Sequence, residues 1–222
     1  MLDALLLDLD GTLIDTPAAI VEITNATFEE LRLPPPDAQV VKNGIGLPLP
    51  VALGQLLGKG PAAAGEAVDT YRRLWRARIN PRLPHALYPG VREGLQALRD
   101  AGLKLAVVTG KAQDGADSNV DMAGLRPFVQ VVLGYTSVAN PKPAPDIALL
   151  AAQRLGVELA RAMVVGDASH DLAMARNAGM RSIAVTYGAQ PLPALQAERP
   201  TFVAHSFGEV VRIALGEARL AP

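Results

Sequence analysis

Five short apolar segments, separated by stretches of helical periodicity, are the feature that most limits how this chain can fold. They are Ala4–Leu7, Lys104–Val108, Val129–Leu133, Met163–Val165 and Ser182–Val185. Most are unbroken apolar runs rather than alternating ones, which is typical of strands buried on both faces of a parallel sheet. A weaker strand at Thr201–Ala204 and a helix from Phe207 are expected to complete the pattern.

Helical stretches lie between the later strands, and each is followed by a glycine. The predicted helices are Val91–Ala101, Asp114–Ala123, Pro145–Leu155 and Ser169–Ala178. Glycine commonly ends a helix because it adopts the left-handed backbone conformation without strain. The alternation of strand, helix and glycine therefore predicts an α/β fold with a doubly wound parallel sheet.

A long stretch after the first strand contains no convincing strand of its own. Its periodicity indicates helices at Ala18–Leu31, Leu49–Leu57 and Ala62–Ile79, with proline-rich joints between them. We therefore predict two parts, namely an α/β core formed by residues 1–15 and 86–222, and an inserted all-helical cap formed by residues 16–85.

The composition of the chain excludes several classes of function. The net charge of the 222 residues is -1, so no basic surplus indicates binding to nucleic acid. The chain has no cysteine, which rules out disulfides, thiolate metal ligands and cysteine nucleophiles. The first apolar segment stops at Asp8, which argues against a signal peptide or a membrane span. We expect a cytoplasmic monomer or homodimer with no nucleic-acid or membrane partner.

Polar residues suited to phosphate chemistry follow four of the predicted strands. They are Asp8 and Asp10 after the first strand, Thr109 to Lys111 after the second, the proline-rich loop around Lys142 after the third, and Asp167 with Asp171 after the fourth. Ligands of open parallel sheets bind beyond the carboxyl ends of the strands, so we expect these residues to meet at one edge of the sheet.

The paired aspartates after the first strand constrain the chemistry further. Residues two apart in an extended chain point to the same face, so the carboxylates of Asp8 and Asp10 would lie close together and repel each other. Such a pair is stable when a cation lies between the two groups or when one of them keeps its proton. The alternative is an ordinary aspartate-rich turn.

The four blocks together resemble the four motifs of the haloacid dehalogenase superfamily of phosphotransferases. The helical insertion resembles the C1 cap of that superfamily, which places the chain near phosphoglycolate phosphatase and its relatives. The resemblance covers nearly the whole chain and is most specific at Asp8 to Thr12 and at Gly166 to Asp171. It implies a Mg²⁺-dependent phosphatase acting on a small phosphorylated metabolite, with 2-phosphoglycolate as the best single candidate.

The resemblance also implies a role for each aspartate of these blocks. Asp8 would be the nucleophile that forms an aspartyl-phosphate, and Asp10 would be the general acid and then the general base. Asp8, the backbone carbonyl of Asp10 and the Asp167 carboxylate would hold the Mg²⁺ ion. Asp171 would either bind the ion directly or orient its water ligands, and the alternative is a first-turn aspartate stabilised by the helix dipole.

Phosphate binding is implied for a further group of residues, namely Gly11, Thr12, Thr109, Gly110 and Lys142. Thr109 would donate a hydrogen bond to a phosphoryl oxygen, and Lys142 would be a fixed cation that offsets the charges of Asp8 and the phosphate. The alternatives are an N-cap for Thr109 and a solvated loop for Lys142. Thr12 would alternatively support one of the aspartates by a hydrogen bond, and Lys111 is either a surface residue or part of the phosphate rim.

The choice of substrate is expected to depend on the cap, because the core chemistry suits any phosphomonoester. The segment from Lys42 to Pro48 resembles the substrate-specificity loop of the family, and Lys42 and Asn43 would bind a carboxylate or hydroxyl of the substrate. Solvated residues at a helix end are the alternative. The basic helix around Arg72 and Arg76 could extend this pocket, and the alternative is that its arginines are mostly solvated. His170 is interpreted as a solvent-facing loop residue.

Several rival functions remain open at this point. An aspartate at position 10 favours phosphate esters over carbon–halogen or carbon–phosphorus bonds, because a leaving alkoxide needs a proton. A pyrophosphatase, a sugar-phosphate phosphatase and a phosphomutase would use the same core. A non-catalytic binding protein would be expected to lack one of Asp8, Asp10, Lys142 or Asp167, and a dinucleotide-binding fold would need a glycine-rich first turn.

Overall fold

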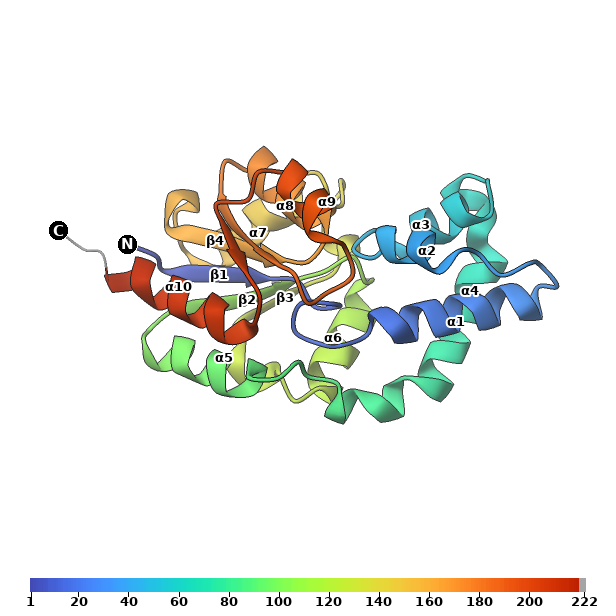
Figure 1. Cartoon of the computed structure of the whole chain (residues 1–222), viewed down its shortest axis with the longest axis horizontal. Helices are drawn as coiled ribbons and strands as arrows, with labels where there is room; N and C mark the ends of the chain where they lie inside the picture. Colours follow the sequence, from blue (N-terminus) through green and yellow to red (C-terminus); the bar gives the residue numbers. More distant parts are fainter. Residues whose placement is uncertain (220–222) are drawn as a thin grey trace.

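The computed structural model describes residues 1–219 and contains a six-stranded parallel sheet flanked by helices (Figure 1). The strands are β1 (Ala4–Leu7), β2 (Lys104–Val108), β3 (Val131–Leu133), β4 (Ala162–Gly166), β5 (Arg181–Val185) and β6 (Phe202–Ala204). Their order across the sheet is β3-β2-β1-β4-β5-β6, and every neighbouring pair is parallel. The predicted doubly wound α/β fold is therefore confirmed.

Helices occupy most of the remaining described residues. They are α1 (Pro17–Glu30), α2 (Ala38–Asn43), α3 (Leu49–Leu56), α4 (Gly65–Arg78), α5 (Val91–Asp100), α6 (Gln113–Met122), α7 (Asp146–Leu155), α8 (Ser169–Asn177), α9 (Leu192–Ala197) and α10 (Phe207–Arg219). Short 3₁₀ turns lie at Pro61–Ala64, Asn80–His85, Arg126–Phe128, Tyr135–Ser137 and Leu159–Arg161. Among residues 1–219, no helix has both the length and the apolar character needed to cross a bilayer.

The central strand is apolar on both faces because helices cover both faces. Leu5 and Leu7 pack into one cluster with residues of α5 and α10, whereas Leu6 packs into a second cluster with residues of α7 and α8. Figure 1 shows these two helical layers on opposite sides of the strands. Alternate side chains of a strand point to opposite faces, so an unbroken apolar run is what a covered parallel sheet requires.

The register of the strands brings three carboxyl ends together. Leu7 of β1 lies beside Val107 of β2 and Val165 of β4, and the Asp8 backbone N–H donates to the Val165 carbonyl at 2.9 Å. The strand order reverses between β1 and β4, and in open α/β sheets such a switch point opens a crevice at the carboxyl edge. The residues that follow β1, β2 and β4 therefore meet in this crevice.

Helices α1 to α4 lie together beyond the carboxyl ends of the strands (Figure 1, right). The chain enters and leaves this helical part through two adjacent segments, where the Asp15 N–H donates to the Ala86 carbonyl at 2.7 Å and the Tyr88 N–H donates to the Leu13 carbonyl at 3.1 Å. The division into a core and a cap at residues 16 and 85 stays a prediction, and both of its boundaries fall beside this paired crossing.

Two helices were not expected from the sequence. Helix α2 has only six residues, which is too short for a recognisable apolar period, although Asp37 caps it by accepting bonds from the backbone N–H groups of Gln39 and Val40. Helix α9 begins after Pro191, inside an apolar stretch that is interrupted by prolines. Strand β3 begins two residues later than predicted, at Val131.

Helices α5 and α10 approach so closely that only glycine fits between them at position 94. A Cβ atom on Gly94 would lie 2.8 Å from the Phe207 ring and from the Val211 side chain. Phe207 is among the largest fully buried side chains, so it has little room to move.

We therefore expect Gly94→Ala to lower the free energy of unfolding by about 1–3 kcal/mol, the usual cost of overpacking, as measured by urea denaturation. The matched control is Gly216→Ala in α10, where no described atom lies within 4 Å of the added methyl group. That variant should be neutral or more stable, by up to about 1 kcal/mol, because alanine favours a helix over glycine. An equal loss in both variants would contradict the close packing of α5 on α10.

Candidate active site

Three carboxylates and one ammonium group from four different segments meet at the carboxyl edge of the sheet. Asp8 follows β1, Asp167 follows β4 and Asp171 lies in the first turn of α8, while Lys142 comes from the loop before α7. Each aspartate contributes an oxygen, and these oxygens all lie within 4.8 Å of one another. All four side chains are buried, so water hardly screens the charges.

Lys142 uses all three of its N–H groups on protein acceptors. Its Nζ donates to Asp8 Oδ1 at 2.7 Å, to Asp171 Oδ1 at 2.6 Å and to the Val108 carbonyl at 2.8 Å. Burial by itself would lower the pKa of Lys142, but the charges of Asp171 and Asp8 outweigh this effect and raise it. The lysine is therefore a permanent cation that fixes the carboxylate of Asp8 in position.

The carboxylates are less well compensated than the lysine. Burial raises the pKa of Asp8 well above its ordinary value; Lys142 opposes this shift, and the neighbouring Asp171 and Asp167 add to it. When ionised, three carboxylates beside one ammonium leave two negative charges without a partner. A divalent cation would neutralise that excess, and a set of oxygen donors is what hard divalent cations prefer. The cluster therefore fits a divalent metal.

Asp167 is held by two hydrogen bonds that orient it toward the cluster. Its oxygens accept from Thr12 Oγ1 at 2.8 Å and from the Ala189 backbone N–H at 2.7 Å. Gly11 has φ +87°, and a Cβ atom there would overlap the Asp167 carboxylate. Burial, followed by the charge of Asp171, raises the pKa of Asp167 to about 7, although both hydrogen bonds oppose the shift. A cation that binds here competes with a proton.

Asp10 points away from this cluster. Its Oδ1 accepts from Thr16 Oγ1 at 2.6 Å, and its Oδ2 forms an ion pair with Lys111 Nζ at 3.0 Å. The same ammonium lies 4.2 Å from the centre of the Trp75 ring in α4. Lys111 thus links an aspartate of the core to an aromatic residue of the helical part. The sequence around Lys111 gave no sign of its contact with Trp75.

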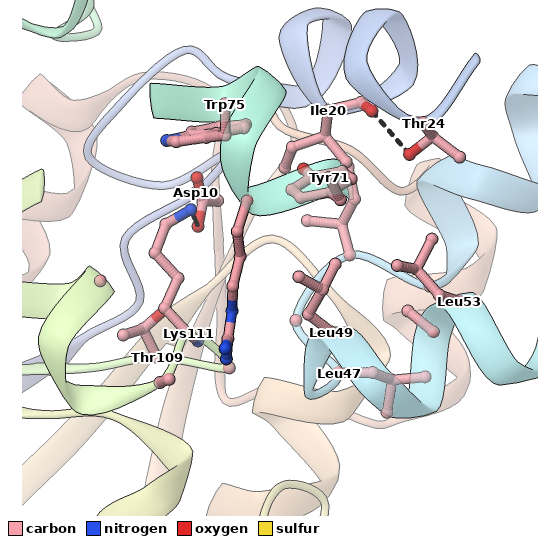
Figure 2. Close-up of a pocket in the computed structure, with 18 of the residues that line it drawn as sticks. Asp10, Ile20, Thr24, Leu47, Leu49, Leu53, Tyr71, Trp75, Thr109 and Lys111 are labelled. Carbon is pink, nitrogen blue, oxygen red and sulfur yellow. Dashed lines mark hydrogen bonds and ion pairs between the residues drawn. The ribbon is translucent and has the colours of Figure 1, made fainter. Parts of the chain in front are cut away.

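A cavity of about 420 Å³ opens between the sheet edge and helices α1, α3 and α4. Asp8, Asp10, Thr109 and Gly110 line its polar end. Figure 2 shows Asp10, Thr109 and Lys111 on one side of this space, facing a wall that includes Ile20 and Leu49. Both carboxylates of the first block are thus exposed to a ligand-sized space.

The helical part is closed against the sheet edge. The Gln190 side chain donates from Nε2 to the Asn43 carbonyl at the end of α2, at 3.1 Å, and His170 Nε2 lies 3.3 Å from the same oxygen. The backbone of Gly46 lies directly against Gly110. Gln190 was missed in the sequence because it lies in a stretch with no motif, and only a contact across the fold identifies it.

The structure does not bring every predicted site residue to the cavity. Thr109 and Gly110 line it, whereas five others are not among its lining residues: Gly11, Thr12, Lys142, Lys42 and Asn43. Thr12 binds Asp167, in agreement with the alternative of a supporting hydrogen bond. The Asn43 side chain accepts a hydrogen bond from Gln39. The roles of these residues in binding phosphate or substrate stay predictions.

Known proteins are similar to this chain in sequence and in fold. Residues 5–185 match the profile of the family described as haloacid dehalogenase-like hydrolase. The chain is 41% identical over 206 residues to the probable phosphatase IndB of Dickeya dadantii, covering 92% of this chain and 90% of that protein. It is 36% identical to a phosphoglycolate phosphatase of Cupriavidus necator, in an alignment that covers 83% of this chain and 81% of that protein. The crystal structure of a predicted phosphatase from Clostridium acetobutylicum superposes on this chain with a TM-score of 0.86 at 22% identity. The superposition covers 97% of this chain and 99% of that one, which supports the fold.

The charge cluster predicts how the protein responds to metal. A divalent cation that binds the folded state at a hundred times its dissociation constant should add about 2.7 kcal/mol to the free energy of unfolding, because the unfolded chain does not assemble the three carboxylates. We expect a corresponding rise in Tm on adding Mg²⁺ to the metal-free protein and no such rise in Asp167→Asn. Asp121→Asn, on the surface of α6, is the control and should respond like wild type. A full rise in Asp167→Asn would contradict the assignment.

The same cluster predicts a dependence of stability on pH in EDTA. The pKa of Asp167 is about 7 in the folded protein against 3.8 ordinarily, so between these values the folded state holds a proton that the unfolded chain has lost. The contribution of Asp167 to stability therefore falls as the pH rises from about 4 to about 7, by at most about 4 kcal/mol. Urea denaturation at several pH values should show this fall in wild type and a smaller one in Asp167→Asn. Identical pH profiles for the two proteins would contradict it.

Proposed function

We propose that this chain, which belongs to the haloacid dehalogenase-like hydrolase family and is a phosphoric monoester hydrolase, acts through an aspartyl-phosphate on Asp8 with Mg²⁺ as its cofactor. The observation that carries the proposal is the environment of Asp8. Its carboxylate lines the cavity, while a buried lysine with no remaining donor holds one of its oxygens at 2.7 Å. A nucleophile needs this combination of a fixed position and access to a ligand.

The first half of the reaction transfers the phosphoryl group to the enzyme. The Asp8 carboxylate attacks phosphorus, and the bond between phosphorus and the ester oxygen breaks. The leaving oxygen takes a proton from Asp10, which also lines the cavity. Thr16 and Lys111 hold the two oxygens of Asp10, so the acid has a defined direction.

The second half returns the enzyme to its starting state. Asp10, now ionised, accepts a proton from a water molecule, and the water oxygen attacks phosphorus. The bond between Asp8 and phosphorus breaks, which releases inorganic phosphate and the free carboxylate. The covalent aspartyl-phosphate thus splits one difficult hydrolysis into two easier steps, and Asp10 assists the first as an acid and the second as a base.

Asp8, Asp167 and Asp171 would hold the Mg²⁺ ion, with the Asp10 carbonyl as the further predicted ligand. When bound, the ion reduces the repulsion between Asp8 and the phosphate and stabilises the charge of the transition state. The oxygen-only donor set and the two uncompensated negative charges support a hard divalent ion. Thr109 and the Gly110 backbone would donate hydrogen bonds to the phosphoryl oxygens from the cavity wall.

The test is phosphate release from a panel of phosphomonoesters and pyrophosphate, measured with Mg²⁺ and with EDTA. We expect wild type to release phosphate in Mg²⁺ but not in EDTA, and Asp8→Asn to release none above background. The rate for Asp10→Asn should fall about 10²–10⁴-fold, because general acid–base catalysis is removed. Asp15→Asn is the matched control, since Asp15 belongs to the same segment but is exposed and lies outside the cavity. Undiminished release by Asp8→Asn would overturn the proposal.

A further inference from the structure

The cavity above the phosphate site has two chemically different sides. The side formed by the β2–α6 segment carries polar residues such as Asp114, Ser118 and Asn119. The side formed by the helical part is lined by large apolar and aromatic side chains: Ile20, Leu47, Leu49, Leu53, Tyr71 and Trp75. Figure 2 shows Ile20, Tyr71, Leu49 and Leu53 grouped along this second wall.

The hydroxyl group on the apolar wall nearest to Ile20 is already occupied. Thr24 lines the cavity, but its hydroxyl donates to the Ile20 carbonyl at 2.8 Å, so it offers a ligand mainly its methyl group (Figure 2). Tyr71 and Trp75 stack on each other with ring centres 5.9 Å apart and planes inclined by 15°, which presents a continuous aromatic surface from α4. This wall therefore favours contact with hydrocarbon over contact with hydroxyl or carboxylate groups.

None of the described cations around the cavity is both fully buried and free of a protein partner. Lys142 has no remaining donor, and Lys111 is committed to Asp10 and the Trp75 ring. The other basic residues that line the cavity are Arg72, which is half-buried, and Arg76, which is exposed. Both belong to α4, the helix that also carries Tyr71 and Trp75. An organic anion seated against the leucines would remain unpaired, which is costly in an apolar environment.

The size of the cavity leads to the same conclusion. Its volume of about 420 Å³ lies within the range of about 300–1,000 Å³ that accommodates drug-sized ligands. A two-carbon acid esterified to phosphate would fill only the polar end beside Asp8 and Thr109 and would leave the apolar wall without contact. A ligand that covers this wall gains binding energy in proportion to the apolar area it buries.

We propose that the substrate is a phosphomonoester with a bulky apolar organic group, alkyl or aryl, whose phosphate lies at Asp8 and whose hydrocarbon lies against α1, α3 and α4. The inference rests on the proposed phosphatase function and adds the chemical class of its substrate. The inference disfavours 2-phosphoglycolate as the substrate, because the apolar wall offers the carboxylate of that molecule no buried cation to pair with.

The first arm of the test compares ethyl, butyl and hexyl phosphate with phenyl phosphate and 2-phosphoglycolate as substrates in Mg²⁺. We expect kcat/KM to rise about fourfold for each added methylene, the factor that corresponds to about 0.8 kcal/mol per buried CH₂, and hexyl phosphate to exceed 2-phosphoglycolate. A flat alkyl series with 2-phosphoglycolate as the best substrate would overturn the inference while leaving the phosphatase function intact.

Matched variants locate the effect. Leu49→Asn places a polar group of similar size on the apolar wall and should lower the hexyl-to-ethyl ratio of kcat/KM about tenfold or more. Leu57→Asn is the control, because Leu57 is a partly buried leucine of the same region that does not line the cavity, and it should leave the ratio unchanged. Equal ratios in wild type and Leu49→Asn would place the hydrocarbon elsewhere and contradict the proposal.

A binding arm separates this inference from the chemistry. Trp75 is the only tryptophan of the chain and lines the cavity, so its fluorescence reports a ligand at the apolar wall. Hexylphosphonate cannot be hydrolysed as an ester and should bind at least about tenfold more tightly than methylphosphonate, with a change in Trp75 emission. If no ester released phosphate, the proposed function would fail, and tighter binding of hexylphosphonate would still support the site. Equal affinities would overturn the inference.

Discussion

The salt bridge that Lys142 makes with Asp8 and Asp171 is the interaction on which the rest of the site depends. Two carboxylates and an ammonium are buried together at 2.6 and 2.7 Å, and a third carboxylate, Asp167, lies in the same cluster. Removing charged groups from water is costly, and a buried pair is tolerated only when geometry and hydrogen bonds compensate. Here the compensation is partial, because the carboxylates outnumber the lysine. The remaining negative charge would favour a bound divalent cation, and that cation would in turn make an anionic substrate acceptable beside the proposed anionic nucleophile.

The fold supplies this geometry through strand register rather than through flexible side chains. Leu7, Val107 and Val165 are neighbours across three strands, so the residues that follow them emerge at one level of the sheet edge. The helical part then closes over that edge, with its Asn43 carbonyl bonded to Gln190 and its Trp75 ring beside Lys111. A closed site excludes water, which strengthens the electrostatics of phosphoryl transfer. We therefore propose that the core determines the reaction, whereas the residues of the helical part determine which organic group fits.

Sequence reasoning identified the fold and the charged cluster because both depend on short-range patterns. Strand-length apolar runs ending in polar residues place Asp8 and Asp167 at the same edge in any parallel sheet of this kind. The sequence could not predict the Gln190–Asn43 contact or the Lys111–Trp75 contact, because each joins segments that are far apart in the chain and carry no local motif. The short helix α2 lacked enough turns to show a period. Lys42 and Asn43 lie outside the cavity lining, whereas Val40 and Val41 of the same helix and the loop from Gly44 to Leu47 belong to it.

The most direct test of this account is the location of the phosphoryl group during turnover. Enzyme mixed with an active phosphomonoester and Mg²⁺, quenched rapidly in acid and digested with protease, should yield one phosphorylated peptide by mass spectrometry. The account predicts that the phosphoryl group lies on the side chain of Asp8, the carboxylate that faces the cavity and is held by Lys142. A phosphoryl group on any other residue would contradict it, because the charge cluster would then be organised around the wrong carboxylate.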